Sequence, residues 1–137
     1  MEGFRYYGLT QALNKSADAM LGVLETSDDF RLPELFCGFR RRGETPPVPY
    51  EVACKPQAWA AGSIFLMLKA MLGLSKEIDQ NYLVFSSPVL PSGLDQLEVK
   101  GLKGVDWELD LRFRRTLNGT SVDVMRRHGT VRVLTVK

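Results

Sequence analysis

The chain has 137 residues, of which 45% are hydrophobic and 25% charged, a composition typical of a globular protein that excludes a largely disordered chain. Its 18 basic and 16 acidic residues leave a formal net charge of +2, which is too balanced to predict a nucleic-acid or lipid surface. One histidine and two cysteines do not provide the ligand spacing of a zinc site, so no metal is expected. We expect Cys37 and Cys54 to be free thiols, as in a reducing cytoplasm, while a bridge between them stays open as the alternative.

Residues 4–25 predict one amphipathic helix, because their apolar side chains recur at steps of three and four positions. The members of this apolar face are Leu9, Leu13, Ala17, Met20 and Leu24. Gly8 and Gly22 weaken a helix, but we expect this one to run through both of them. The sequence TSDD at 26–29 then ends the pattern.

A long connection over residues 30–56 contains five prolines. Connections of this length are unusual in a compact domain and tend to be functional. Its first part, RLPELFCGF at 31–39, places five apolar residues around one Pro-Glu pair, which indicates the wall of a pocket rather than an ordinary polar loop. Two interpretations of Glu34 stay open here: a structural carboxylate that caps a backbone amide or pairs with Arg31, or a functional carboxylate in that pocket.

Residues 57–74 predict a helix that is apolar nearly all round, with Pro56 at its first position. A membrane span needs roughly 20 mostly apolar residues. However, Gln57, Ser63 and Lys69 interrupt this stretch and no aromatic belt accompanies it, so no membrane insertion is expected. A helix that is hydrophobic on every side is otherwise buried in a larger helical assembly, and this chain offers few partners to cover it.

The remainder of the chain is strand-like, with candidate strands at 82–89, 97–102 and 105–113. The last of these alternates strictly, so that one face carries Val105, Trp107, Leu109, Leu111 and Phe113. Its other face is charged, and we expect that face to be a solvated surface.

Two turns are expected beyond these strands. Asn118-Gly119 fits a type I′ turn, in a register that places Phe113 opposite Val124. His128-Gly129 then turns the chain into a strand at 130–136. The expected result is a small antiparallel sheet or sandwich with one dry face.

Two motifs and a short link between them carry a resemblance. RLPELFCGF at 31–39 is followed by PY at 49–50 and by ACKPQAWAAGS at 53–63. In this order they resemble the C-terminal part of bacterial glycogen-debranching-type amylo-α-1,6-glucosidases of the six-hairpin glycosidase superfamily. The resemblance implies an α+β chain, in which residues 1–75 are the last helical hairpin of an (α/α)6 toroid and residues 76–137 form a C-terminal antiparallel β-domain.

The resemblance also implies a site. Glu34 would be the general base of an inverting mechanism, in which it activates a water while a separate acid, about 6.5–9.5 Å away, protonates the leaving oxygen. Phe36, Tyr50 and Trp59 would be aromatic walls for a pyranose, and Gln57 would open the last inner helix beside the sugar. The implied substrate is a glucan or an oligosaccharide, and no cofactor is implied.

Chain length limits this interpretation. Twelve helices of ~10–14 residues joined by loops of ~4–6 need about 200 residues. Residues 1–75 cannot close a toroid, and Met1 directly before a helix agrees with a fragment boundary. We therefore expect the C-terminal part of a cytoplasmic glycoside hydrolase, inactive alone because nothing before Glu34 matches the catalytic acid. The alternative is a small non-enzymatic α+β interaction module that uses helix 57–74 to bind a partner protein or a second copy of itself.

Overall fold

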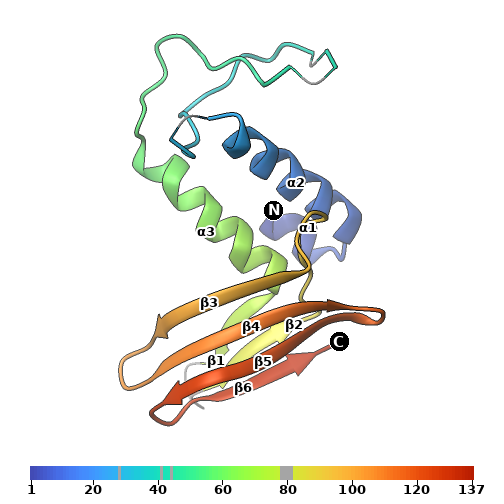
Figure 1. Ribbon diagram of the computed structural model, residues 1–137, viewed down its shortest axis with the longest axis vertical. Coiled ribbons are helices and arrows are strands. Elements are labelled where there is room, and N and C mark those ends of the chain that lie inside the picture. The colour runs from blue at the N-terminus through green and yellow to red at the C-terminus, as the bar shows by residue number, and fades with distance from the viewer. Residues whose placement is uncertain (28, 41, 44, 78–81) are drawn as a thin grey trace.

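The computed structural model describes residues 1–27, 29–40, 42–43, 45–77 and 82–137, without the side chains of residues 76 and 77. Within these residues three helices precede six strands, which confirms the predicted α+β class (Figure 1). The helices are α1 (Glu2–Tyr6), α2 (Thr10–Glu25) and α3 (Ala58–Leu72). The strands are β1 (Leu74–Glu77), β2 (Tyr82–Ser86), β3 (Gln96–Lys103), β4 (Glu108–Thr116), β5 (Gly119–His128) and β6 (Arg132–Val136).

The chain turns at Gly8 between α1 and α2, so the expected single helix over residues 4–25 is wrong. Gly8 has a φ of +68°, in the left-handed region that glycine enters without a steric cost. Leu9 consequently becomes the N-cap of α2, and its side chain is half exposed instead of buried. Leu13 and Ala17, on the same predicted face, are buried as expected. Gly22 lies inside α2, also as expected.

The helix α3 begins later than predicted, at Ala58, with Gln57 as its N-cap. Pro56 therefore lies outside the helix rather than at its first position. At the other end, Gly73 adopts the left-handed conformation, with a φ of +60°, and terminates the helix. In the part of the chain that the structure describes, no helix has the length and apolar character that a membrane span requires.

A small apolar core joins α2 to one side of α3. Its buried members are Leu13, Ala17, Met67, Ala70 and Met71. Other positions of α3, among them Trp59, Phe65 and Leu66, are exposed. Burial on every side, which the sequence of α3 predicts, is therefore not achieved within this chain.

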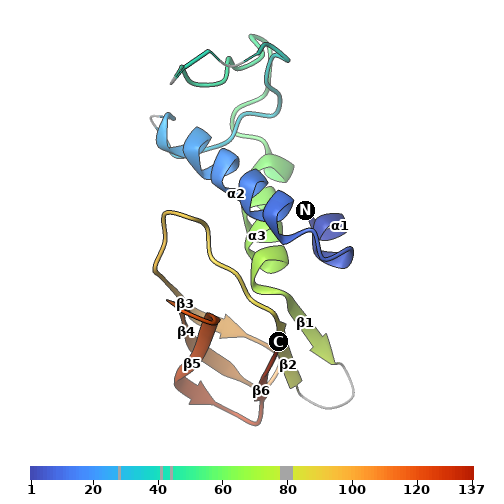
Figure 2. The same ribbon diagram turned by 90° about the vertical axis from the view of Figure 1, so that its right-hand side faces the viewer.

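Two sheets pack face to face beyond the helices (Figure 2). In the described residues each sheet has three strands, in the orders β3-β4-β5 and β1-β2-β6. The first sheet is antiparallel throughout, whereas β6 pairs in parallel with β2. Of the expected sheet or sandwich, the sandwich forms. The β2–β6 pair is parallel rather than antiparallel as expected, because the segment after His128-Gly129 crosses to the second sheet instead of extending the first.

The core of this sandwich lies between the two sheets. Phe85 of β2 and Phe113 of β4 meet edge to face, with 5.1 Å between their ring centroids. The other buried members of the cluster are Leu72, Leu83, Leu90, Trp107, Leu109, Leu111 and Val131. The dry face predicted for residues 105–113 is thus confirmed except at Val105, which is 99% exposed. Val105 lies in a tight turn that the Gly104 amide closes by donating to the Trp107 carbonyl oxygen (3.0 Å).

The β4–β5 hairpin forms where it is expected, but its register differs from the prediction. Thr116 pairs with Gly119, so the turn residues are Leu117 and Asn118, and Phe113 faces Val122 rather than Val124. A type I′ turn requires a positive φ at both central residues. Among the described residues, positive φ at this turn is found at Gly119, which follows the two central positions.

Two side chains attach the helices to the segment that follows β2. The Arg5 guanidinium donates a hydrogen bond to the Ser87 carbonyl oxygen (2.9 Å). The Asp18 carboxylate accepts hydrogen bonds from the Ser92 amide (2.8 Å) and the Ser92 hydroxyl (2.6 Å). The domain boundary expected between residues 75 and 76 falls within β1, beside this junction, and stays a prediction.

Candidate functional site

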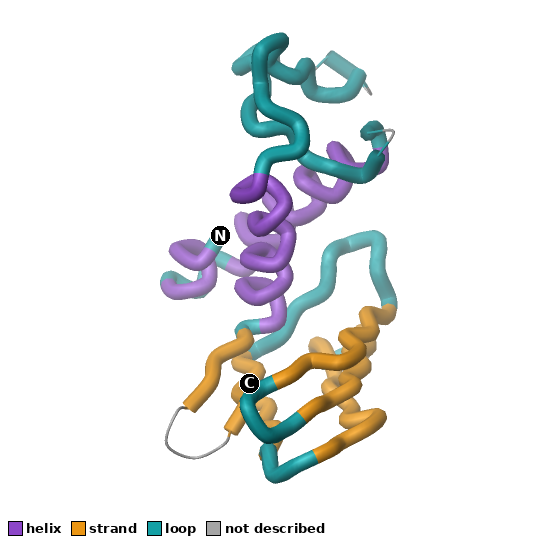
Figure 3. The backbone as a smooth tube through the Cα atoms, turned by 90° about the vertical axis from the view of Figure 1, so that its left-hand side faces the viewer, coloured by secondary structure: helices purple, strands orange, loops and turns teal. Residues whose placement is uncertain are grey.

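The connection between α2 and α3 lies at the end of the molecule farthest from the sheets (Figures 1 and 3). Its two arms run antiparallel and share backbone hydrogen bonds. The Cys37 amide donates to the Val48 carbonyl oxygen (2.8 Å), and the Tyr50 amide donates to the Leu35 carbonyl oxygen (3.1 Å). These bonds make the proline-rich connection a two-armed ribbon.

Glu34 is held at the base of this ribbon by two hydrogen bonds to Cys54. The Glu34 amide donates to the Cys54 carbonyl oxygen (3.2 Å), and Oε2 of the carboxylate accepts a hydrogen bond from the Cys54 amide (3.1 Å). The carboxylate therefore caps a backbone amide, one of the structural roles that the sequence left open. Arg31 is engaged through its backbone, because its amide donates to Asp29 (3.2 Å).

Glu34 also lines a groove of about 310 Å³ between α2, the start of α3 and the ribbon. Two aromatic residues, Phe36 and Trp59, lie in the same lining, and the Trp59 side chain is 60% exposed. Leu32 and Pro33 contribute buried apolar surface to the groove. The structure thus brings together three of the five residues that the resemblance implied.

The other two, Tyr50 and Gln57, lie outside the lining of this groove. Tyr50 is 49% exposed, and its amide belongs to the ribbon. Gln57 uses its side-chain oxygen to accept a hydrogen bond from the Ala58 amide (3.1 Å) at the start of α3. Their roles in binding a substrate stay predictions, and the geometry gives Gln57 a structural role as a helix cap.

Glu34 is the one carboxylate among the described residues that line the groove. Asp29, another acidic residue of the connection, has a defined set of partners. Its Oδ1 accepts a hydrogen bond from the Ser27 hydroxyl (2.8 Å) and lies 3.0 Å from the Lys55 Nζ. The Ser27 hydrogen bond, followed by that of Lys55, lowers the pKa of Asp29 to about 2. Since a general acid must carry a proton at its working pH, Asp29 does not fit the missing acid.

Lys55 was not indicated by the sequence as a residue of this site. Its Nζ contacts both Asp29 (3.0 Å) and the Ser27 hydroxyl (3.1 Å). It also lines a second hollow of about 210 Å³, which adjoins the groove at Pro33 and Phe36. Residues at the two ends of a long irregular connection have no regular spacing in the sequence, so the contacts of Lys55 with Asp29 and Ser27 could not be predicted from it.

Cysteine chemistry and metal binding are the remaining possibilities that the sequence raised. Cys37 and Cys54 are free thiols, as expected, and the alternative of a bridge between them is not formed. Across the described residues, no group of three or more histidine, cysteine, aspartate or glutamate side chains is placed to hold a metal ion.

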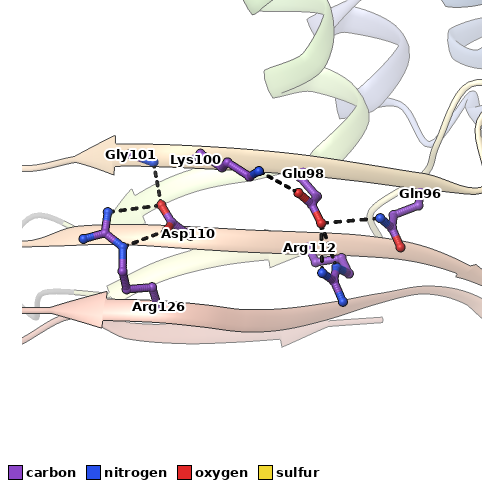
Figure 4. Close-up of polar contacts among 7 residues, drawn as sticks. All are labelled: Gln96, Glu98, Lys100, Gly101, Asp110, Arg112 and Arg126. Carbon is purple, nitrogen blue, oxygen red and sulfur yellow. Dashed lines mark hydrogen bonds and ion pairs between the residues drawn. The ribbon is translucent and has the colours of Figure 1, made fainter.

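Charged side chains also gather on the outer face of the β3-β4-β5 sheet (Figure 4). Arg126 contacts Asp110, and this hydrogen bond is the largest cause of the lowered pKa of that carboxyl. Arg112 lies 2.9 Å from Glu98 in the same way. Cations and carboxylates alternate across neighbouring strands and neutralise each other, which agrees with the solvated surface that the sequence predicts.

Comparison with known proteins adds no relative: no protein-family model, no curated protein and no solved structure matches the chain.

Proposed function

We propose that this chain is the C-terminal part of a glycogen-debranching-type amylo-α-1,6-glucosidase and contributes the general base, Glu34, to a site that hydrolyses α-glucosidic bonds. The observation that carries the proposal is a carboxylate beside aromatic side chains in one groove, formed by Glu34, Phe36 and Trp59. Aromatic faces pack well against pyranose rings, while the carboxylate takes a proton from the attacking water.

The hydrogen bond from Cys54 supports this role, because it orients the carboxylate of Glu34. The catalytic acid would come from another segment of the parent enzyme, about 6.5–9.5 Å from Glu34. The exposed side chains of Phe65 and Leu66 on α3 would pack against such segments. The proposal includes a glucan or oligosaccharide substrate and a cytoplasmic location, and it implies that the isolated chain binds the sugar without hydrolysing it.

The first test uses the two tryptophans, of which Trp59 is 60% exposed and Trp107 only 6%. Maltose- and isomaltose-type oligosaccharides are titrated into the chain while tryptophan emission is recorded. We expect a saturable change that is absent in Trp59→Phe, because Trp107 is buried away from the groove. The β-linked disaccharide cellobiose is the control, and an equal response to it would contradict an α-glucan site.

Turnover provides the second test. We expect no release of glucose from either class of α-glucoside, because a single carboxylate does not complete the mechanism. Robust hydrolysis that survives Glu34→Gln would overturn both the fragment assignment and the role of Glu34 as the base.

Exposed apolar residues of α3 support a second candidate, a non-enzymatic interaction module. Phe65 and Leu66 are 74% and 59% exposed, and neighbouring exposed apolar residues are typical of a protein contact. Light scattering over a range of concentrations distinguishes the candidates. A defined oligomer that Phe65→Ser dissociates, and that Leu117→Ser at the hairpin tip does not, supports the module. A monomer that binds α-glucans contradicts it.

A further inference from the structure

We propose that Asp29 and Lys55 form a clamp that positions Glu34 by holding the Cys54 amide against its carboxylate. The inference rests on the proposed function, since it assigns positioning residues to the proposed base.

The clamp joins the two ends of the connection between α2 and α3. Lys55 Nζ lies 3.0 Å from Asp29 Oδ1 and donates a hydrogen bond to the Ser27 hydroxyl oxygen (3.1 Å). The Ser27 hydroxyl lies 2.8 Å from the same Asp29 oxygen, and the Arg31 amide donates to that oxygen as well (3.2 Å). The segment that leaves α2 is thereby tied to the segment that approaches α3.

The position of Lys55 in the chain connects the clamp to Glu34. Both hydrogen bonds that hold Glu34 go to Cys54, which is the residue directly before Lys55. A displacement of Lys55 away from Asp29 therefore carries the Cys54 amide with it. The carboxylate of Glu34 would then lose the donor that orients it in the groove.

Lys55 also borders the aromatic wall. It lines the 210 Å³ hollow together with Phe36, and Phe36 is shared with the groove that contains Glu34. The clamp therefore lies beside both Cys54, which binds the base, and the hollow that Phe36 lines. Asp29 and Lys55 are 44% and 40% exposed, so we expect their pairing to have a moderate effect, about two- to fivefold, on how often the Cys54 amide is hydrogen-bonded to Glu34.

Nuclear magnetic resonance of the full chain, without sugar, tests the clamp. At neutral pH the Cys54 amide resonance should shift in Glu34→Gln, because the substitution removes the charge of the oxygen to which that amide donates. The amplitude of this shift, measured with and without a second substitution, reports how closely the amide and the carboxylate are held together. Asp29, with a pKa of about 2, is charged at neutral pH, so its ion pair with Lys55 is present during the measurement. We expect the amplitude to fall by about half or more in Lys55→Met, and to be retained in Lys55→Arg, which can still pair with Asp29.

The control is Lys100→Met, because Lys100 is also an exposed lysine in an ion pair, with Glu98 at 3.2 Å on the sheet. An unchanged amplitude in Lys55→Met, or an equal loss in Lys100→Met, would overturn the clamp. If Lys55→Met disturbs the amide resonances of the sandwich, Asp29→Asn decides instead. It keeps an acceptor oxygen for Ser27 and removes the charge that attracts Lys55.

The clamp and the proposed function fail separately. Trp59 emission that does not change when α-glucans are added contradicts the proposed function. The Cys54 amide resonance tests the clamp in the absence of any ligand. A positioning role further predicts weaker α-glucan binding in Lys55→Met than in the wild-type chain, with rescue in Lys55→Arg, under conditions in which both variants are fully folded. A loss of affinity that follows the loss of stability would instead indicate a merely structural pair.

Discussion

Two glycine-to-alanine changes in or beside α3 should shift the free energy of unfolding in opposite directions. Gly62 lies inside the helix, and a Cβ added there meets no heavy atom within 4 Å. Gly73 ends the helix with a φ of +60°, and a Cβ added there would overlap the Ser86 carbonyl oxygen and the Arg5 guanidinium. The same substitution therefore adds a methyl group at a helical position with free space and at a left-handed position without it.

The magnitudes follow from these environments. Gly62→Ala should stabilise the protein by about 1 kcal/mol, because alanine favours the helix and its methyl group meets no obstacle. At Gly73 the left-handed conformation costs an alanine about 1–2 kcal/mol. Displacing the Ser86 backbone adds about 1–3 kcal/mol of overpacking. We therefore expect Gly73→Ala to destabilise the protein by about 2–5 kcal/mol.

Urea unfolding followed by circular dichroism measures both variants, with the denaturant slope as the check that the change lies in the native state. Gly62→Ala, made on the same helix, is the matched control for Gly73→Ala. A loss below about 1 kcal/mol in Gly73→Ala, or a shift of the same sign in both variants, would refute the described end of α3 and its contact with β2.

Two further predictions concern the core and acid stability. Phe113→Ala should lower the free energy of unfolding by about 3–5 kcal/mol, because the ring is fully buried between the sheets, while Phe65→Ala, at 74% exposure, should change it by less than about 0.5 kcal/mol. Equal losses in urea unfolding would show that Phe65 is covered in solution. The pKa of Asp29 is lowered to about 2 in the folded chain, against an ordinary value of about 3.9, so its contribution to stability is present above about pH 4 and is lost as the pH falls through about 2. Carboxyl resonances measured against pH should place the Asp29 midpoint near 2, and a midpoint near 4 would contradict its pairing with Ser27 and Lys55.

The spacing of apolar residues correctly predicted which faces of α2 and β4 are buried. The apolar spacing around Leu13 and Ala17 identified the buried face of α2, and the alternation from Trp107 to Phe113 identified the dry face of β4. The break at Gly8 was missed, because an apolar repeat does not show whether a glycine continues a helix or takes a positive φ. The location of the β4–β5 hairpin was predicted correctly. Its register was not, because the residue with the positive φ, Gly119, follows the two central turn positions instead of occupying one of them.

Partners that are distant in the chain could not be predicted. The strand character of residues 132–136 was visible, but their pairing with β2 depends on how the two sheets pack. The motifs predicted a pocket around Glu34, and the structure places Phe36 and Trp59 beside it. The contacts of Glu34 with Cys54 and of Asp29 with Lys55 depend on the path of the proline-rich connection, which neither propensity nor spacing determines.

The parallel pairing of β6 with β2 bears on how the chain emerges from the ribosome. β2 is the central strand of its sheet, and one of its two neighbours consists of residues 132–136. At translation rates of about 5–20 residues per second, one edge of β2 stays unpaired for several seconds after its own synthesis. An unpaired strand edge is a template for pairing with other chains. A nascent chain, or one shortened before residue 132, would therefore present this edge of β2 for pairing with other chains.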